Sequence, residues 1–422
     1  MSYLDSLLEN VDVEWKSLGE IATLVRGNGL PKSDFTEQGV GCIHYGQIYT
    51  YYGTSAQFTK SYVSEETAKG LKQVNPNDII ITNTSENVED VCKAVVWEGD
   101  GNIVTGGHAT IIKGLPVPRF FVYYTQTKRF FDMKKKLATG IKVIDVSANN
   151  LAKIKVPIPC PGNPEKSLAI QKEIVRILDT FEKLTAELTA ELTARKKQYE
   201  YYRNQLLGFK ELSDLAGGGN SLIVNGLSSI PSGIYLLPLS EIAQYAKDKI
   251  EAAEVDEDNY VGVDNLLQNK QGKTASTYVP ANGRLTKYEE KNILIGNIRP
   301  YLKKIWYSDN LGGTNGDVLV IQVTSDLVLP KYLYTVLCGD KFFDYNMQHA
   351  KGAKMPRGSK DAIMRYQIPI PSIKEQQRIV TILDKFDTLT TSISEGLPKE
   401  IELRKKQFEY YRDMLLSFPK PA

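Results

Sequence analysis

The chain is internally duplicated, and this feature constrains its fold more than any other. Residues 174–181, Ile-Val-Arg-Ile-Leu-Asp-Thr-Phe, recur at 379–386 as Ile-Val-Thr-Ile-Leu-Asp-Lys-Phe. Residues 195–203, Arg-Lys-Lys-Gln-Tyr-Glu-Tyr-Tyr-Arg, recur at 404–412 with Phe in place of the first Tyr. We therefore expect a globular unit followed by a helix, and then the same pair again.

A weaker match extends the duplication into the globular parts. Residues 118–159 align with residues 330–371 without gaps, at an offset of 212. The match includes a Phe-Phe-Asp triplet, a Gly-x-Lys triplet that contains Lys142 or Lys354, and a Pro-Ile-Pro triplet. The two globular units are therefore expected to end in the same way.

The matched helical segments carry a single apolar stripe. Apolar residues between Ile170 and Leu206 are spaced by threes and fours or by seven, which predicts a helix of roughly 40 residues and about 60 Å. A stripe this narrow is typical of a coiled-coil seam, and an antiparallel pair is the simplest closure. The second copy has four extra residues, which include Gly396 and Pro398, so we predict a break there.

The fold class expected is α/β, with mixed α+β globular units. Residues 78–82, 109–112, 292–295 and 318–321 are rich in β-formers, and residues 119–137 and 331–349 look helical. The expected domains are a first unit with a short N-terminal helix at 1–160, helix one at 161–210, a Gly-rich linker at 211–233, a second unit at 234–371, helix two at 372–418 and a tail at 419–422.

Composition excludes several classes of protein but selects none. The 52 Lys and Arg residues nearly balance the 50 Asp and Glu residues, so bulk charge does not identify a partner. The chain contains neither an apolar window of 18 residues nor a secretory leader pattern, which predicts a protein that is neither membrane-spanning nor secreted. Four cysteines without a CxxC pair are typical of a reduced cytoplasmic protein, and we expect all four thiols to be buried or inert.

Motifs for catalysis are missing. The Gly-rich residues 312–316 lack the Lys of a phosphate-binding loop, and no Asn/Asp-Pro-Pro-aromatic loop of a methyltransferase is present. His44, His108 and His349 are far apart and form no metal-ligand pattern. We therefore expect no catalytic residues and no metal site, and a reader or a scaffold is favoured over an enzyme.

Local charge points to nucleic acid. Residues 113–155 contain ten basic and two acidic side chains, and the equivalent residues 325–367 contain seven and four. Phosphate contact is the natural use of such an excess, and its recurrence favours DNA over a solvated helix face. Lys142 and Lys354 occupy equivalent Gly-x-Lys positions and are predicted to contact phosphate, and Arg357 lies in the same basic stretch.

Base reading requires side chains with donors and acceptors on loops or helix ends. The candidates in the first unit are Arg26, Asn28, His44, Gln47, Asn83, Ser85, Asn87 and His108. Those in the second are Asn265, Asn297, Arg299, Lys303, Lys304 and Asn315, with Tyr301 placed to pack on sugar or phosphate. For each of them a turn-forming Asn or a surface Arg is the alternative.

Several of these motifs together resemble a known family. Tandem Thr-Ala-Glu-Leu units at 185–192, the duplicated Arg-Lys-Lys-Gln blocks and Ile-Leu-Ile-Gly-Asn-Ile-Arg-Pro-Tyr at 293–301 are similar to the specificity subunit of type I restriction-modification systems, in its IC-like branch. The resemblance covers essentially the whole chain. It implies two target recognition domains that each read one half of a split double-stranded DNA site, with the helices acting as a ruler.

The same resemblance implies partners and cofactors. Two modification subunits would dock on the chain and restriction (translocase) subunits would join them, with S-adenosylmethionine, ATP and Mg on those partners only. Because a duplicated surface implies a duplicated partner, the expected docking residues are Arg195, Lys196, Lys197, Tyr201, Arg203, Arg404, Lys405, Lys406, Tyr410 and Arg412. The alternative is a duplicated coiled-coil scaffold that reads no bases.

Overall fold

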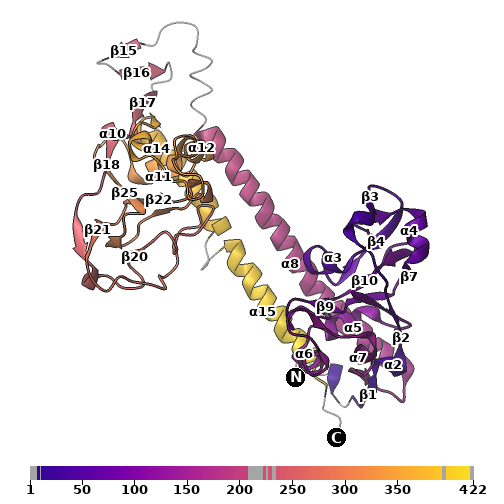
Figure 1. Cartoon of the computed structure of the whole chain (residues 1–422). Coiled ribbons are helices and arrows are strands. Elements are labelled where there is room, and N and C mark those ends of the chain that lie inside the picture. The colour runs from indigo at the N-terminus through magenta and orange to yellow at the C-terminus, as the bar shows by residue number, and fades with distance from the viewer. Residues whose placement is uncertain are drawn as a thin grey trace. The chain divides into compact units, whose positions relative to one another are not determined.

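The chain forms two compact units. The computed structural model describes residues 7–9, 11–207, 222–224, 227–230, 234–391 and 396–418. Unit 1 comprises residues 1–187 and 401–422, and unit 2 comprises residues 188–400. The long helix α8 (Pro164–Leu206) contributes its first part to unit 1 and its second part to unit 2 (Figure 1).

Two five-stranded sheets form the globular part of unit 1. The first has the order β2-β12-β8-β10-β5, with β2 (Thr23–Arg26), β12 (Ala109–Lys113), β8 (Ile79–Thr82), β10 (Ala94–Trp97) and β5 (Ser55–Ala56). The second has the order β3-β6-β4-β11-β7, with β3 (Phe35–Thr36), β6 (Ser61–Val63), β4 (Val40–Ile43), β11 (Ile103–Thr105) and β7 (Lys72–Val74). Strand β8 (Ile-Ile-Ile-Thr) is buried on both faces, which explains why all four residues are β-branched and the first three apolar.

Short helices pack beside the first sheet. The expected helical segment 119–137 is divided into α5 (Pro118–Tyr124) and α6 (Lys128–Leu137), because the Thr127 hydroxyl caps the second helix. Strand β1 (Val13–Ser17) pairs antiparallel with β14 (Lys155–Pro159), which is followed by α8. The smaller elements are α2 (Leu18–Ile21), α3 (Tyr45–Thr50), α4 (Glu65–Gly70), α7 (Ala148–Leu151), β9 (Thr84–Ser85) and β13 (Ile144–Asp145).

Unit 2 repeats the first sheet. Its order β18-β25-β22-β23 matches β2-β12-β8-β10, with β18 (Ala243–Tyr245), β25 (Val318–Val323), β22 (Ile293–Gly296) and β23 (Ile305–Tyr307). A second sheet has the order β19-β21-β24-β20, with β19 (Lys249–Glu251), β21 (Arg284–Tyr288), β24 (Gly312–Thr314) and β20 (Tyr260–Val261). The helices are α10 (Leu239–Ile242), α11 (Pro330–Leu337), α12 (Asp340–Gln348), α13 (Lys360–Met364) and α14 (Ile373–Thr391), with a 3-10 turn η3 (Pro300–Leu302).

The segment expected to be a linker contains strands. β15 (Leu222–Val224) and β16 (Leu227–Ile230) form a sheet with β17 (Ile234–Pro238) and β26 (Gln367–Ile370). The Gly-rich residues 216–221 lie outside the described residues, as do most of the expected N-terminal helix and the tail at 419–422.

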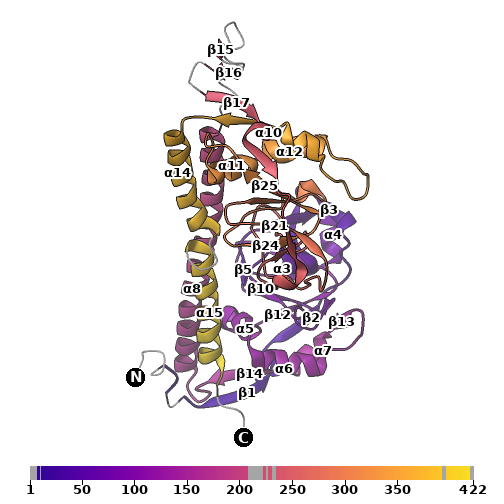
Figure 2. The ribbon, with the colours of Figure 1, turned by 90° about the vertical axis from the view of Figure 1, so that its left-hand side faces the viewer.

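The long helices pair antiparallel. In unit 1, Phe181 of α8 stacks on Tyr411 of α15 (Gly396–Leu416), with ring centroids 5.2 Å apart. In unit 2, Phe386 of α14 lies 5.6 Å from Tyr202 of α8. Phe386 repeats Phe181 and Tyr411 repeats Tyr202, so the start of each copy packs on the end of the other. Figure 2 shows α15 beside the first part of α8 and α14 beside the second part.

The second long helix is interrupted, as predicted. Helix α14 ends at Thr391 and α15 begins at Gly396, with residues 392–395 outside the described part. The φ angle of Gly396 is +77°, and a Cβ there would lie 2.7 Å from the Thr388 carbonyl oxygen, so only glycine fits without rearrangement. Pro398 falls in the first turn of α15, where its missing N–H is tolerated.

The four cysteines are free and buried, which confirms the expectation of inert thiols. Burial raises the pKa of Cys42 and Cys338 to about 11 and that of Cys92 to about 12. Such thiols carry almost no thiolate at neutral pH.

Candidate nucleic-acid interface

Lys142 lies at the tip of a closed loop, which we call the first lysine loop (residues 139–145). Thr139 and Asp145 each donate a backbone N–H to the other's carbonyl, at 2.9 and 2.8 Å. Gly140 has a φ of +100°, and a Cβ there would lie 2.0 Å from the Val143 carbonyl oxygen. The backbone of this turn therefore requires glycine at position 140, and the turn presents Lys142 to solvent.

Lys354 lies on an equivalent loop in unit 2, the second lysine loop (residues 351–357). Lys351 and Arg357 exchange the same two backbone hydrogen bonds, at 2.9 and 2.8 Å. Gly352 has a φ of +101°, and Lys354 is exposed. The duplication at an offset of 212 is thus reproduced bond by bond in this structure.

Each lysine loop is tied to its sheet by an asparagine at a strand end. Asn83 follows β8 and Asn297 follows β22. The N–H of Val146 donates to the Asn83 carbonyl at 2.8 Å, and the N–H of Gly358 donates to the Asn297 carbonyl at 3.1 Å. The side chain of Asn83 adds a bond to the Val146 carbonyl at 2.7 Å. Both loops therefore have a fixed position on their own unit.

An ion pair also fastens each lysine loop to its unit, but the loop supplies the acidic partner in unit 1 and the basic partner in unit 2. In unit 1, Arg26 of β2 lies 3.4 Å from Asp145 of the loop. In unit 2, Arg357 of the loop lies 3.0 Å from Asp317. Asp145 and Arg357 occupy equivalent positions, so the charge presented beside each lysine differs between the units.

Three further candidates of unit 1 keep accessible surface, and one of them, the half-buried Ser85, contacts the first lysine loop. Ser85 pairs with Ile144 through the short ladder β9-β13. Asn28 is exposed, forms a bridge to Gly106 and donates its amide to the Gly70 carbonyl. Exposed Asn87 bonds Asp90 through its amide, at 2.7 Å.

His108 is the exposed aromatic member of this group. Its φ of +65° is unusual for a residue with a Cβ. Nδ1 lies 3.0 Å from the Thr84 hydroxyl, and the ring centroid is 5.0 Å from that of Tyr45. The ring is therefore oriented by its neighbours while it remains accessible.

Five of the candidates are buried: His44, Asn83, Asn265, Asn297 and Lys304. Asn83 has no exposed surface, and its Oδ1 accepts from the Thr110 hydroxyl at 2.9 Å. The buried amide of Asn265 bonds Gly262 N–H, the Tyr260 carbonyl and the Thr274 carbonyl. Lys304 donates its ammonium to the Val263 carbonyl, and burial lowers its pKa. These groups are used within their units.

Asn297 is also buried, at 7% exposure, but its Oδ1 has no hydrogen-bond partner among the described residues. A strand-end Asn that recurs in both units was the sequence signal for a structural role.

His44 and Gln47 organise α3. Nδ1 of His44 accepts from the Gly46 N–H at 3.1 Å, so the imidazole caps the helix. Gln47 accepts from the His44 N–H at 3.2 Å and donates to the Ser61 hydroxyl at 2.6 Å. Burial, followed by the charges of Lys32 and His108, lowers the pKa of His44, which keeps the ring neutral at neutral pH.

In unit 2, the exposed candidates Arg299 and Tyr301 lie at η3. Arg299 has a φ of +53°, and its N–H donates to the Pro356 carbonyl of the second lysine loop at 2.7 Å. Arg299 is exposed and Tyr301 is 49% exposed. Asn315 is half-buried and accepts from the Asp317 N–H at 3.0 Å.

Lys303 is ion-paired within unit 2, with an aspartate that also pairs with Lys270 and lies 3.8 Å from Arg203. Its ammonium lies 2.8 Å from Asp340, which also accepts from Lys270 at 3.0 Å. Burial alone would raise the pKa of Asp340, but the bonds from Lys303 and Lys270 lower the pKa to about 2. Lys303 therefore holds η3 to the start of α12.

The duplicated helical blocks present matching side chains. Arg195 bonds Gln198 and Arg404 bonds Gln407, both at 3.1 Å. Tyr201 and Tyr410 are 60% and 65% exposed. The exposed lysines of the two blocks are Lys196, Lys197, Lys405 and Lys406.

Arg203 is 2% exposed, which corrects the expectation of an outer face. It lies 5.7 Å from the Tyr199 ring and donates to the Cys338 carbonyl at 3.4 Å. Its repeat Arg412 is half-buried, 2.8 Å from Asp413 and 5.8 Å from the Phe408 ring. These arginines therefore belong to the packing of their units.

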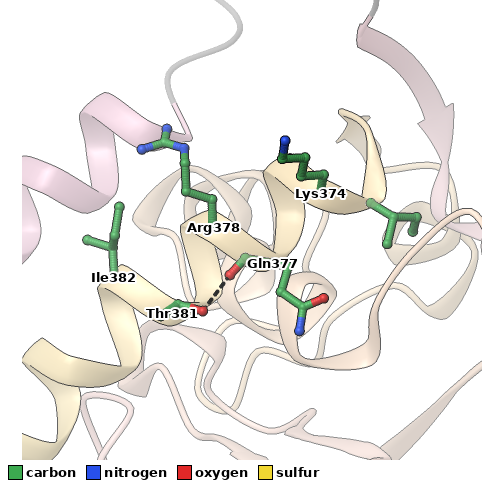
Figure 3. A pocket seen from close by; sticks show the side chains of 6 residues that line it. Lys374, Gln377, Arg378, Thr381 and Ile382 are labelled. Carbon is green, nitrogen blue, oxygen red and sulfur yellow. Dashed lines mark hydrogen bonds between the residues drawn. The ribbon is translucent and has the colours of Figure 1, made fainter.

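The described residues form a shallow hollow on a helix and no cluster of metal ligands. A hollow of about 540 Å³ on α14 has lining residues from that helix alone, with Arg378 paired to Glu375 and Thr381 bonded to the Gln377 carbonyl (Figure 3). No group of three His, Cys, Asp or Glu in the described part of the chain could hold a metal ion. Nor does that part include a helix with the length and apolarity needed to cross a membrane.

Comparisons with known proteins agree over the whole length. The chain is 36% identical over 450 residues to the EcoR124I/EcoR124II specificity subunit of Escherichia coli, covering 100% of this chain and 98% of that protein. It is 29% identical to a putative type I specificity subunit of Haemophilus influenzae, covering 99% and 98%. The S subunit structure from M. genitalium shares the fold, with a TM-score of 0.55, 16% identity and 98% coverage of both chains.

The family model of the type I restriction modification DNA specificity domain matches twice, at residues 10–195 and 237–403. Each match covers one globular unit and the first part of the helix that follows it. The chain therefore belongs to the family of type I restriction-modification DNA specificity subunits.

Proposed function

We propose that each unit reads one half of a split DNA site, and that the lysine loops hold the phosphate backbone. The observation that carries this proposal is the pair of equivalent, rigidly closed loops that each expose a lysine at the tip, Lys142 or Lys354, beside exposed polar side chains. Phosphate contacts fix register and orientation, whereas base contacts specify sequence. A loop common to both units suits the first task, and side chains that differ suit the second.

The proposed reading side chains are those that remain accessible. In unit 1 they are Arg26, Asn28, Ser85, Asn87 and His108, and in unit 2 they are Arg299, Tyr301, Asn315 and Arg357. Buried or internally bonded residues such as His44, Gln47, Asn297 and Lys303 would position these loops.

The duplicated helical surfaces are proposed to dock two modification subunits. Tyr201 with Lys196 and Lys197, and Tyr410 with Lys405 and Lys406, form one such surface in each unit. Restriction subunits would join through the modification complex. The chain is the non-catalytic component by family, and we place S-adenosylmethionine, ATP and Mg on the partners and the assembly in the cytoplasm.

Methylome sequencing of cells that carry the chain with its modification subunit tests the proposal. We expect a methylated motif with two specified halves and an unread spacer. Arg299→Ala should relax only the half read by unit 2, since one bidentate contact contributes about 1–3 kcal/mol. Relaxation of both halves would refute independent reading.

The phosphate contact has a separate readout. Lys142→Ala should weaken binding to every duplex and reduce the salt-dependence slope by about one, with the motif unchanged. Lys16→Ala, which removes an exposed lysine paired with Glu14, is the control. If binding by the complex is indifferent to residues of both units, the chain is a scaffold.

A further inference from the structure

The tips of the lysine loops carry exposed apolar side chains beside the lysine. Ile141 is 96% exposed and Val143 is 58% exposed, on either side of Lys142. Met355, which follows Lys354 in the second loop, is 52% exposed. A phosphate contact needs only the lysine, so the apolar neighbours in both copies require a separate account.

The loops are built to hold these side chains rigidly. The two cross-loop backbone hydrogen bonds and the glycine of positive φ recur in both units. A contact made by such a loop loses little conformational entropy on binding. The exposed tip is therefore preorganised for insertion into a binding partner.

That partner should be common to both units. The ion pairs beside the loops are reversed in sign, so the surfaces around the two lysines differ. The loop geometry and the apolar tip are nevertheless shared. A feature shared by two units that read different bases fits a target that does not depend on the base sequence.

Size and charge favour DNA over protein as this target. One or two side chains cover far less than the roughly 1,000 Å² that a stable protein interface buries. The loops lie in stretches with ten basic against two acidic residues and seven against four. Apolar side chains such as Ile and Met do insert between base steps from the minor groove, beside basic residues that hold the backbone.

We propose that the two lysine loops are minor-groove wedges, with Ile141 and Val143 in unit 1 and Met355 in unit 2 inserted against the sugars and base steps. The lysine of each loop holds the adjacent phosphate. This proposal rests on the proposed function, since it assumes that both units face the duplex. It adds a deformation of the DNA that phosphate contact alone does not produce.

The test uses the full chain assembled with its modification subunits and a duplex labelled at both ends for energy transfer. I141S/V143S and M355S remove the apolar tips of the two units separately. F58S, at 82% exposure in unit 1, and L327S, at 56% in unit 2, are matched controls. We expect each tip variant to weaken binding about tenfold on cognate and non-cognate duplexes alike, which corresponds to about 1.4 kcal/mol.

The tip variants should also reduce the end-to-end bend and leave the salt slope and the methylated motif unchanged. Unchanged affinity or an unchanged bend overturns the wedge. Loss of a modification subunit in a mass measurement, with the bend retained, assigns the loops to protein docking instead. A wild-type complex without a split motif refutes the proposed function, whereas the bend and affinity still report on the wedge.

Discussion

Replacing Asn83 by alanine separates a structural role from base reading. The side chain is fully buried, donates to the Val146 carbonyl at 2.7 Å and accepts from the Thr110 hydroxyl at 2.9 Å. Thr110 is itself fully buried, so Asn83→Ala leaves a hydroxyl and a carbonyl without these bonds. Each such loss costs about 1–3 kcal/mol, and we expect the free energy of unfolding to fall by about 2–6 kcal/mol.

The loss should be confined to unit 1. Because two units need not unfold together, hydrogen exchange followed peptide by peptide in denaturant is the suitable assay. Peptides of β8 and β12 should lose protection, whereas those of β22 and β25 should not. Asn297→Ala is the matched control, since the Oδ1 of Asn297 lacks a hydrogen-bond partner in the described structure and less is lost.

The methylated motif tests the alternative role, in which Asn83 reads a base. At a temperature where unit 1 stays folded, Asn83→Ala should leave both half-sites unchanged, although a loosened first lysine loop should weaken binding overall. An Asn83→Ala chain of normal stability with one relaxed half-site would refute this reasoning and return Asn83 to the base-reading surface.

The remaining predictions concern partners, pH and the ruler. Tyr201→Ala and Tyr410→Ala should each remove one modification subunit from the complex, as measured by native mass, with Tyr235→Ala as control. Because the folded-state pKa of Asp340 lies near 2, below the ordinary 3.8, its contribution to unit 2 stability is present above about pH 4 and is lost as pH falls towards 2. Asp340→Asn should therefore reduce the change in the free energy of unfolding of unit 2 between about pH 4 and pH 2, as measured by denaturant unfolding at each pH. A third Thr-Ala-Glu-Leu unit after Leu192 adds about 6 Å and roughly 40° to α8, and methylome sequencing should show a spacer longer by one base pair with both half-sites unchanged.

The duplication was sufficient to predict most of the fold. The apolar stripe predicted the long antiparallel helices, the extra residues predicted the break before α15, and the β-rich runs became the central strands β8, β12, β22 and β25. The composition of residues 211–233 predicts a linker, whereas residues 222–224 and 227–230 form strands β15 and β16. Their pairing is local, since β15 pairs with β16 and β16 with β17, and Asn225-Gly226 is a hairpin signal that composition alone does not weigh.

The candidate site was harder to predict, because the type of a polar residue does not indicate whether its side chain is buried or exposed. Asn28 and Asn83 are the same residue type and each follows a strand, yet one is exposed and the other has no exposed surface. Tertiary contacts make the difference, since the Asn83 amide bonds the Val146 carbonyl and the Thr110 hydroxyl in the interior of unit 1. Recurrence was the available signal: Asn83 and Asn297 both follow the central strand, and a residue that reads different bases in the two units has no reason to recur.

Duplication of a sequence block does not by itself distinguish a surface that docks a partner from one that packs inside the unit. The helical period does distinguish them, as Arg203 shows. The duplication predicts an outer face for five residues of the block 195–203, and Tyr201 and Arg203 are two of them. Arg203 follows Tyr199 by four residues, however, and Tyr199 belongs to the apolar stripe that packs on Phe386. The period therefore places Arg203 inside unit 2 and Tyr201, two residues away, on another face, where it is 60% exposed. The same spacing places Arg412 beside Phe408 and leaves Tyr410 exposed, so the docking surface that we propose consists of the tyrosines and their neighbouring lysines.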